Sequence, residues 1–409
     1  MENITKDMKQ LHIEKYNQKY WDKEFSTRSI HIGQPPDPFF GSVNVPIHMS
    51  STFIKPDWSN PFYKYDYGRM GNPTREALET CLASLENGKY ALMTSSGMSA
   101  VMLITHLLDA GDHIIAGDDL YGGTVTYFNK IVSKTYGIET TYVDMSDLDL
   151  LRESIQDNTK IVFIETPTNP LLKWFDIKAI SEICKEHNLI FVVDNTFMSP
   201  YNQKPLDLGA DIVMHSATKY LAGHSDVIMG ALITSNKDIY DRLYFLLYAL
   251  GPIPSPFDCY LVLRSCKTLS VRMKQIGENA LVVAKHLESH PKVEKVYYPG
   301  LESHKYYEVH KKQAKTGAGV ISFVIKGGTS SISWSFLQHL KIILVAVSIG
   351  GVESLAQWPA LITHSSIPRH KREELGIVDG LIRLSVGIED VNDLIGDLNQ
   401  AFDAIKDLP

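Results

Sequence analysis

The sequence contains little cysteine, and its cysteines follow no recognisable pattern. The four among 409 residues, Cys81, Cys184, Cys259 and Cys266, are scattered and form no CxxC pair. Such spacing supports neither a disulfide framework nor a structural metal site. We therefore expect a protein without a bound metal that works in a reducing compartment, with the cytoplasm as its location.

Long apolar runs and blocks of one charge are also absent. No apolar stretch approaches membrane-spanning length, and the N-terminus "MENITKDMKQLHIEKYNQKYWDKEF" lacks the apolar centre of a secretory signal. Forty Lys and Arg stand against 47 Asp and Glu, which gives a formal charge of -7. These features predict a protein that binds neither membranes nor nucleic acid, so its partners should be a small molecule and further copies of itself.

Nucleotide-binding patterns and internal repeats are missing as well. Neither a GxGxxG fingerprint nor a Walker lysine motif occurs, and no repeat period or low-complexity tract is present. These absences argue against a nucleotide-dependent dehydrogenase and against a solenoid.

The chain does contain a regular alternation of strand and helix patterns. The short β-rich runs are "YALMTSS", "HIIAGDD", "KIVFIETP", "LIFVVDNTF", "DIVMHSATK" and "VIMGALITS", with helical segments such as "DIKAISEICKEHN" between them. Apolar strands separated by helices predict an α/β fold with a mainly parallel sheet wrapped by helices. After about residue 265, longer helical stretches and the strand candidates "GAGVISFVIKGG" and "LIRLSVGIED" predict a smaller C-terminal α+β domain.

Polar residues follow three of the predicted strands or turns, and the carboxyl ends of parallel strands meet at one edge of a sheet. Lys219 in "HSATKYLAGHSD" lies among small hydroxyl residues, where an uncompensated ammonium is costly, so its setting suits a nucleophile. Asp194 ends an apolar strand and needs a buried donor or cation, unless it is an ordinary turn aspartate. "SSGMSA" places Ser96 and Gly97 at a strand-to-helix turn that favours a phosphate, although an ordinary capped helix has the same pattern.

A phosphate cradle, a buried carboxylate and a lysine are together what pyridoxal 5'-phosphate requires. The carboxylate keeps the pyridine nitrogen protonated, and the lysine binds the cofactor through a Schiff base.

Seven segments, in order, resemble the signature segments of the Cys/Met-metabolism pyridoxal-phosphate enzymes. They are "YGRMGNPTR", "SSGMSA", "DDLYGGT", "ETPTNP", "VVDNTF", "HSATKYLAGHSD" and "IRLSVGIED". The resemblance runs from about residue 26 to about residue 405 and implies a fold-type I enzyme that forms a homotetramer of two tight dimers. The predicted division is an N-terminal arm with subunit contacts at 1–65, a cofactor-binding α/β domain at 66–265 and the α+β domain at 266–409.

The resemblance also implies a role for each matching residue. Lys219 resembles the Schiff-base lysine, Asp194 the partner of the ring nitrogen, and Tyr121 the tyrosine that stacks on the ring and assists proton transfer. The residues that resemble phosphate contacts are Ser96, Gly97, Met98, Ser216 and Thr218, together with Tyr67 and Arg69 donated by the neighbouring subunit. Those that resemble substrate-binding positions are Arg383, which would bind the α-carboxylate, with Asn169, Ser348, Asp66 and Val347.

The implied reaction is γ-elimination of a sulfur amino acid, and the segments most resemble those of cystathionine γ-lyases. Such an enzyme converts L-cystathionine to cysteine, 2-oxobutanoate and ammonia, a transsulfuration step of cysteine biosynthesis, with hydrogen sulfide release as a side reaction. The intact set of lysine, aspartate, tyrosine and arginine argues against a non-catalytic protein of this fold.

The substrate itself stays open between alternatives. Val347 stands where cystathionine γ-lyases have an acidic residue and resembles methionine γ-lyases, which release methanethiol. Gly123 and "PSPFDCYL" favour the cystathionine enzymes, Asp66 keeps an acid near the entrance, and Thr126 replaces an arginine. A cystathionine γ-synthase shares every catalytic residue named and is the third alternative.

Overall fold

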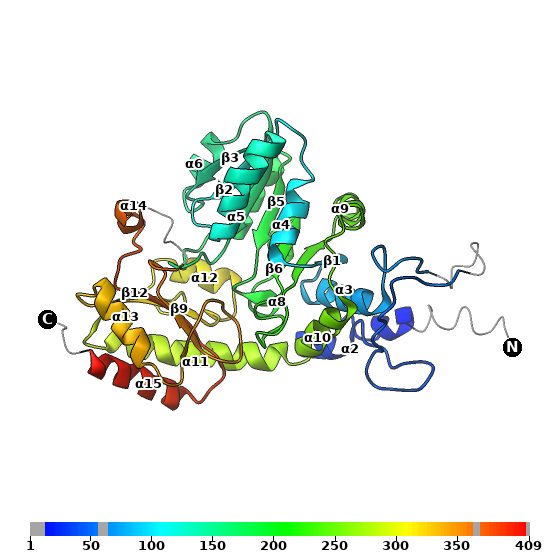
Figure 1. The fold of residues 1–409 in the computed structure, drawn as a ribbon. Helices are drawn as coiled ribbons and strands as arrows, with labels where there is room; N and C mark the ends of the chain where they lie inside the picture. Colours follow the sequence, from blue (N-terminus) through cyan, green and yellow to red (C-terminus); the bar gives the residue numbers. More distant parts are fainter. Residues whose placement is uncertain (1–12, 56–63, 363–368, 406–409) are drawn as a thin grey trace.

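The computed structural model describes residues 13–55, 64–362 and 369–405. These ranges contain two β-sheets, each covered by helices (Figure 1). In the described residues, no helix combines the length and the apolar character needed to cross a membrane.

The larger sheet has seven strands in the order β1-β7-β6-β5-β4-β2-β3. The strands are β1 (Tyr90–Thr94), β2 (His113–Gly117), β3 (Glu139–Val143), β4 (Thr159–Glu165), β5 (Ile190–Asp194), β6 (Ile212–Ser216) and β7 (Gly230–Thr234). All pairs are parallel except those that β7 makes with its two neighbours. The predicted α/β fold with a mainly parallel sheet is therefore confirmed.

Helices cover both faces of this sheet because successive strand residues point to opposite sides. In β5, for example, Val192 belongs to the same apolar core as residues of α4 (Gly97–Thr105), the π-helix η1 (Phe128–Tyr136) and α9 (Lys237–Leu250), whereas Val193 belongs to a core with residues of α6 (Leu148–Glu153) and α7 (Ile177–Glu186). Near β1 and β7 the second face is covered by α3 (Pro73–Leu85) and α10 (Pro256–Cys266). Both faces are thus buried, as the nearly continuous apolar strands predict.

The smaller sheet has five strands in the order β10-β11-β12-β9-β8. They are β8 (Val293–Tyr297), β9 (Val320–Ile325), β10 (Leu344–Val345), β11 (Leu355–Gln357) and β12 (Leu381–Ser385), with antiparallel pairing except between β10 and β11. Helices α13 (Ser330–His339) and α15 (Val391–Ala404) pack on it. This is the smaller α+β unit that the sequence predicts.

One long helix belongs to both units. Helix α11 (Leu269–Ser289) places Met273 and Ile276 in the core beneath the larger sheet and Val283 and Leu287 in the core of the smaller one, and it runs along the base of the molecule in Figure 1. The predicted domain boundary near residue 265 falls just before this shared helix and stays a prediction. The remaining labelled elements are α2 (Phe25–His31), α5 (Gly122–Tyr127), α8 (Ser199–Asn202), η2 (Pro205–Leu208), α12 (Tyr307–Gln313) and α14 (Arg369–Glu374).

The parallel strands bring polar residues to one edge. Strands β4, β5 and β6 end at Glu165, Asp194 and Ser216, and Glu165 lies opposite Asp194 in the strand register. Since neighbouring strands are about 4.8 Å apart, these side chains form one cluster at the carboxyl edge of the sheet.

Candidate active site

Lys219 lies in the turn that follows β6, with its backbone N-H donating to Ser216 O at 3.1 Å. Its Nζ donates to Ser348 Oγ at 2.8 Å, which joins the larger unit to the smaller one. Burial lowers the pKa of Lys219 to about 8, and the positive charge of Arg383 adds to the effect. Ser348 has φ of +114°, a strained conformation that persists only where the surroundings fix it. The lysine is therefore held as an amine that loses its proton readily.

Arg383 lies on β12 and faces the same site. Its NH1 donates to Asn169 Oδ1 at 2.8 Å and its NH2 donates to Ser348 O at 2.9 Å. The buried Nε has no hydrogen-bond partner in the described part of the chain. Burial lowers the pKa of this guanidinium to about 10. A desolvated planar cation with a free donor suits the carboxylate of an amino acid.

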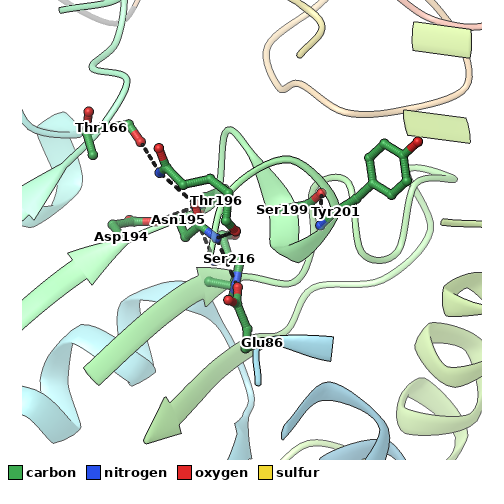
Figure 2. A network of polar contacts seen from close by, with 10 residues as sticks. Glu86, Thr166, Asp194, Asn195, Thr196, Ser199, Tyr201 and Ser216 are labelled. Atoms are coloured by element: carbon green, nitrogen blue, oxygen red, sulfur yellow. Dashed lines mark hydrogen bonds and ion pairs between the residues drawn. The ribbon is translucent and has the colours of Figure 1, made fainter. Parts of the chain in front are cut away.

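Asp194 is buried at the end of β5 (Figure 2). Its Oδ1 accepts from Thr196 N at 3.0 Å and from Thr196 Oγ1 at 2.5 Å, and within the described ranges Oδ2 makes no hydrogen bond. Burial raises the pKa of Asp194, while the hydrogen bonds of Thr196 and the charge of His215 act in the opposite direction. One oxygen is fixed and the other is left for a partner such as a protonated ring nitrogen.

The residues predicted to bind phosphate meet where α4 begins. The Ser96 side chain caps this helix by accepting from Ser99 N at 3.1 Å, as the ordinary-cap alternative anticipates. A Cβ on Gly97 would lie 3.0 Å from Ser216 Cβ, so the helix start packs directly against the end of β6. The amide groups of Gly97 and Met98 belong to the first turn, where N-H groups lack helical partners.

Thr218 lies in the turn after β6, between Ser216 and Lys219 in the sequence. Its backbone N-H donates to Met229 O at 3.2 Å, and its Oγ1 accepts from Met229 N at 3.0 Å. These bonds fix the turn that carries Ser216, Thr218 and Lys219. The two hydroxyl residues and the helix start are therefore held as one rigid group.

Tyr121 is half exposed at the start of α5. Its backbone N-H donates to Glu165 Oε2 at 2.8 Å, and a Cβ on Gly123 would lie 2.4 Å from Tyr121 Cε1. The Tyr121 ring thus lies over Gly123, and a larger residue at position 123 would displace the ring. Burial raises the pKa of Glu165 well above its ordinary value, and neighbouring Asp194 adds to the rise.

Asp66, Tyr67 and Arg69 make their contacts with residues outside this cluster. Arg69 NH1 donates to Tyr248 O, Arg69 lies over the Tyr67 ring at 5.6 Å, and Asp66 pairs with Lys55 at 2.6 Å. In the described ranges, no hydrogen bond, ion pair or ring contact joins them to Lys219 or Asp194. Their predicted roles in the active site stay predictions, and for Tyr67 and Arg69 the lack of contact with Lys219 and Asp194 in the described ranges is compatible with donation to a neighbouring subunit.

Val347 is more than half exposed next to Ser348. It therefore borders the site with an apolar side chain rather than filling the core.

The residues that are together fit pyridoxal phosphate. The start of α4 at Gly97 packs closely against Ser216, so its backbone N-H groups and the Ser216 hydroxyl can bind one phosphate. Asp194 Oδ2 is available for the ring nitrogen, and Lys219 supplies the amine. In the described ranges, none of these residues forms an ion pair that cofactor binding would have to break.

Comparison with known proteins agrees with this geometry. The family model described as "Cys/Met metabolism PLP-dependent enzyme" matches residues 26–403. The chain belongs to this family. As a member it uses pyridoxal 5'-phosphate, and the predicted fold type and cofactor are thereby confirmed.

Several relatives share about half of its residues. The cystathionine gamma-lyase of Dictyostelium discoideum is 51% identical over 380 residues, which cover 93% of this chain and 98% of the relative. That of Bos taurus is 49% identical over 383 residues, or 93% of this chain and 94% of the relative. The crystal structure of metB from Corynebacterium glutamicum has a TM-score of 0.89 at 44% identity, covering 93% of this chain and 98% of that one. Cystathionine gamma-lyase from Lactobacillus plantarum complexed with L-serine has a TM-score of 0.90 at 42% identity, covering 94% of this chain and all of that one.

Three residues near the site were not singled out by the sequence analysis. Glu165 and His215 lie inside the motif segments "ETPTNP" and "HSATK". Both could have been singled out from the sequence, because each is a polar residue at the end of an apolar strand. Glu86 lies at the end of α3, far away in sequence, and carried no signal of its own.

Proposed function

We propose that this chain is a carbon–sulfur lyase that cleaves L-cystathionine to cysteine, 2-oxobutanoate and ammonia. The observation that carries the proposal is the hydrogen-bonded set of Lys219, Ser348, Arg383 and Asn169, in which Arg383 and Asn169 are buried. Relatives about half identical to it and named cystathionine gamma-lyase support the choice of substrate. Release of hydrogen sulfide from cysteine or homocysteine would be a side reaction of the same residues.

Each residue has a defined task in this proposal. When bound, pyridoxal phosphate supplies an electron-withdrawing ring that stabilises negative charge on the substrate's α-carbon. Arg383 binds the α-carboxylate, with Asn169 and Ser348 holding the guanidinium in place. Asp194 Oδ2 holds a proton on the ring nitrogen through the charge of its carboxylate.

Proton transfer falls to two side chains. Lys219, whose pKa is lowered to about 8, takes a proton from the substrate's α-carbon as an uncharged amine. Removal of a proton from the β-carbon then lets the sulfur leave the γ-carbon, and Tyr121, positioned at the open side of the site by Glu165, supplies the proton that the departing sulfur takes up. The remaining four-carbon fragment is hydrolysed by water to 2-oxobutanoate and ammonia.

Methionine γ-elimination is a second candidate because of Val347. An exposed valine at the border of the site offers an apolar wall to a thioether methyl and no partner to the distal ammonium of cystathionine. A γ-synthase activity, in which cysteine replaces the leaving group, would use the same residues and remains the third alternative.

The deciding experiment compares substrates on the purified, cofactor-loaded protein. We would measure kcat/KM for L-cystathionine and L-methionine side by side and identify 2-oxobutanoate and the released thiol. Preference for cystathionine supports the proposal, and preference for methionine replaces it with a methionine γ-lyase. Product analysis with an activated homoserine ester plus cysteine tests the synthase, and Lys219→Ala serves as the inactive control.

The proposal includes a homotetramer with shared active sites. Within the described ranges, Tyr67 and Arg69 do not contact Lys219 or Asp194 of their own chain, and apolar side chains of the N-terminal arm such as Phe40 and Val43 are largely exposed. Such a surface suits burial against a second copy. A cytoplasmic location is part of the same proposal and is supported by four unpaired, buried cysteines.

A further inference from the structure

The C-terminal end of α3 places a carboxylate in the interior behind the site. Glu86 is fully buried, and its Oε1 accepts from Asn195 Nδ2 at 2.9 Å (Figure 2). The same Oε1 lies 2.5 Å from His215 Nε2. In the part of the chain that the structure describes, Glu86 Oε2 is buried without a hydrogen-bond partner. A buried carboxylate with an unpaired oxygen destabilises the fold, so its presence requires another explanation.

The two partners of Glu86 are neighbours of site residues. Asn195 directly follows Asp194, and His215 directly precedes Ser216. On the other side of the sheet edge, Thr196 Oγ1 donates to Asp194 and accepts from Ser216 N at 2.8 Å. Because successive strand residues point to opposite faces, Thr196 and Glu86 join the ends of β5 and β6 from both sides.

The same contacts reach the opposite side of the site. Asn195 Nδ2 also donates to Gln203 O, while Gln203 Nε2 donates to Asn195 Oδ1 and to Thr166 O. Thr166 begins the segment that carries Asn169, the partner of Arg383. Glu86 therefore anchors a buried polar network that touches the ends of three adjacent strands.

Electrostatics agree with this geometry. Burial raises the pKa of Asp194, and the positive charge of His215 opposes the rise. A carboxylate behind His215 orients that imidazole through its Nε2.

We propose that Glu86 is a positioning residue for the cofactor site, acting through His215 and Asn195 to hold Asp194 and Ser216 where they meet the cofactor. The inference rests on the proposed roles of Asp194 and Ser216. Glu86 itself touches neither cofactor nor substrate in this arrangement.

The test is Glu86→Gln, which keeps the size of the side chain and removes its charge. Charge-assisted hydrogen bonds are about twice as strong as neutral ones, so we expect the Kd of the stripped protein for pyridoxal phosphate to rise about tenfold. We also expect kcat for cystathionine to fall about tenfold and KM to change less than about twofold, since the Arg383 contacts are kept.

Asp211→Asn is the matched control. The Asp211 carboxylate also links β5 and β6, accepting from Phe191 N at 2.8 Å, but at the opposite ends of the two strands. It should alter the thermal stability of the stripped protein and leave the Kd for pyridoxal phosphate unchanged.

Wild-type affinity in Glu86→Gln, or an equal loss of affinity in Asp211→Asn, would overturn the inference. If Glu86→Gln does not fold, Asn195→Ala decides in its place, because it removes the Asn195 donor to Glu86 together with the two bonds to Gln203. A rise in Kd of at least about threefold is expected, and an unchanged Kd would count against the inference. Failure of the wild-type protein to bind pyridoxal phosphate would instead contradict the proposed function, so the two failures are distinguishable.

Discussion

At the scale of single residues, Lys219 is an amine in surroundings that disfavour its charge. Its pKa falls from 10.5 to about 8, so the unfolded chain binds this proton more tightly than the folded chain does. Below pH 8 both states are protonated, and the folded state bears the full cost of the buried charge. The protonated lysine therefore destabilises the folded apoprotein at low pH, and this penalty disappears as the pH rises from 8 to 10.5.

Lys219→Met should accordingly stabilise the apoprotein by about 1–3 kcal/mol at pH 7 and by much less near pH 10. Urea unfolding of both stripped proteins at the two pH values measures the difference. A stabilisation of equal size at both would show that packing rather than charge is responsible.

Asp194→Ala should bind the cofactor yet turn over cystathionine at least about 100-fold more slowly, because the ring nitrogen loses the charge that keeps it protonated. Visible absorption of the bound cofactor and kcat for cystathionine are the two measurements. Turnover above about a tenth of the wild-type rate in a fully loaded variant would count against the assigned role.

Val347→Glu should change the substrate preference. An added carboxylate beside Ser348 offers a partner to the distal ammonium of cystathionine and a polar wall to methionine. We expect the ratio of the two kcat/KM values to shift toward cystathionine by about tenfold. Val347→Gln controls for size, and a shift of the same size with this neutral side chain would exclude the electrostatic explanation.

At the scale of elements, the contact between α4 and β6 decides whether a phosphate can approach the helix start. A Cβ on Gly97 would lie 3.0 Å from Ser216 Cβ, so Gly97→Ala must push the two elements apart by a few tenths of an ångström. We expect the Kd for pyridoxal phosphate to rise about tenfold, because phosphate bonds depend on this spacing.

Gly396→Ala is the control for this change. Gly396 lies within α15, and a Cβ there meets nothing within 4 Å. This variant should be more stable by about 1 kcal/mol through helix propensity and bind the cofactor normally. Equal cofactor affinity in the two variants would show that the helix start does not form the phosphate site.

The elements also show which sequence signals were sufficient. Six strands of the larger sheet were predicted because each is a run of buried apolar residues, but β3 was missed because its segment "ETTYV" lies partly exposed at the sheet edge. Strands β8, β10 and β11 were missed for a similar reason: β8 is half exposed, and the other two are only two or three residues long.

At the scale of the whole molecule, Arg69 and Lys219 have no common contact in the described ranges, and the proposed tetramer predicts that one active site needs two chains. Arg69→Ala and Lys219→Ala should each be inactive alone. When their subunits are exchanged, one of the two sites in each mixed dimer regains both residues, so about a quarter of the wild-type activity should return. Mixed dimers that form but stay inactive would show that each chain builds its own site.

The sequence by itself determined the fold class and the cofactor, and it singled out the residues that are predicted to bind that cofactor and the substrate. Asp194 ends an apolar strand, Arg383 lies within one and Lys219 lies in the turn just after one, where a charged residue is costly and therefore conspicuous. Local pattern was enough to single out Lys219 and Asp194, because a parallel sheet brings the ends of its strands together, whereas the predicted role of Arg383 came from the family resemblance.

Only the tertiary structure decided which distant residues support them. Ser348 meets Lys219 across 129 positions of sequence, and Glu86 meets His215 across another 129. No local period encodes such pairs, since they arise when α3 and the smaller sheet pack against the ends of β5 and β6. The lowered pKa of Lys219 has the same origin, because burial exists only in the folded chain.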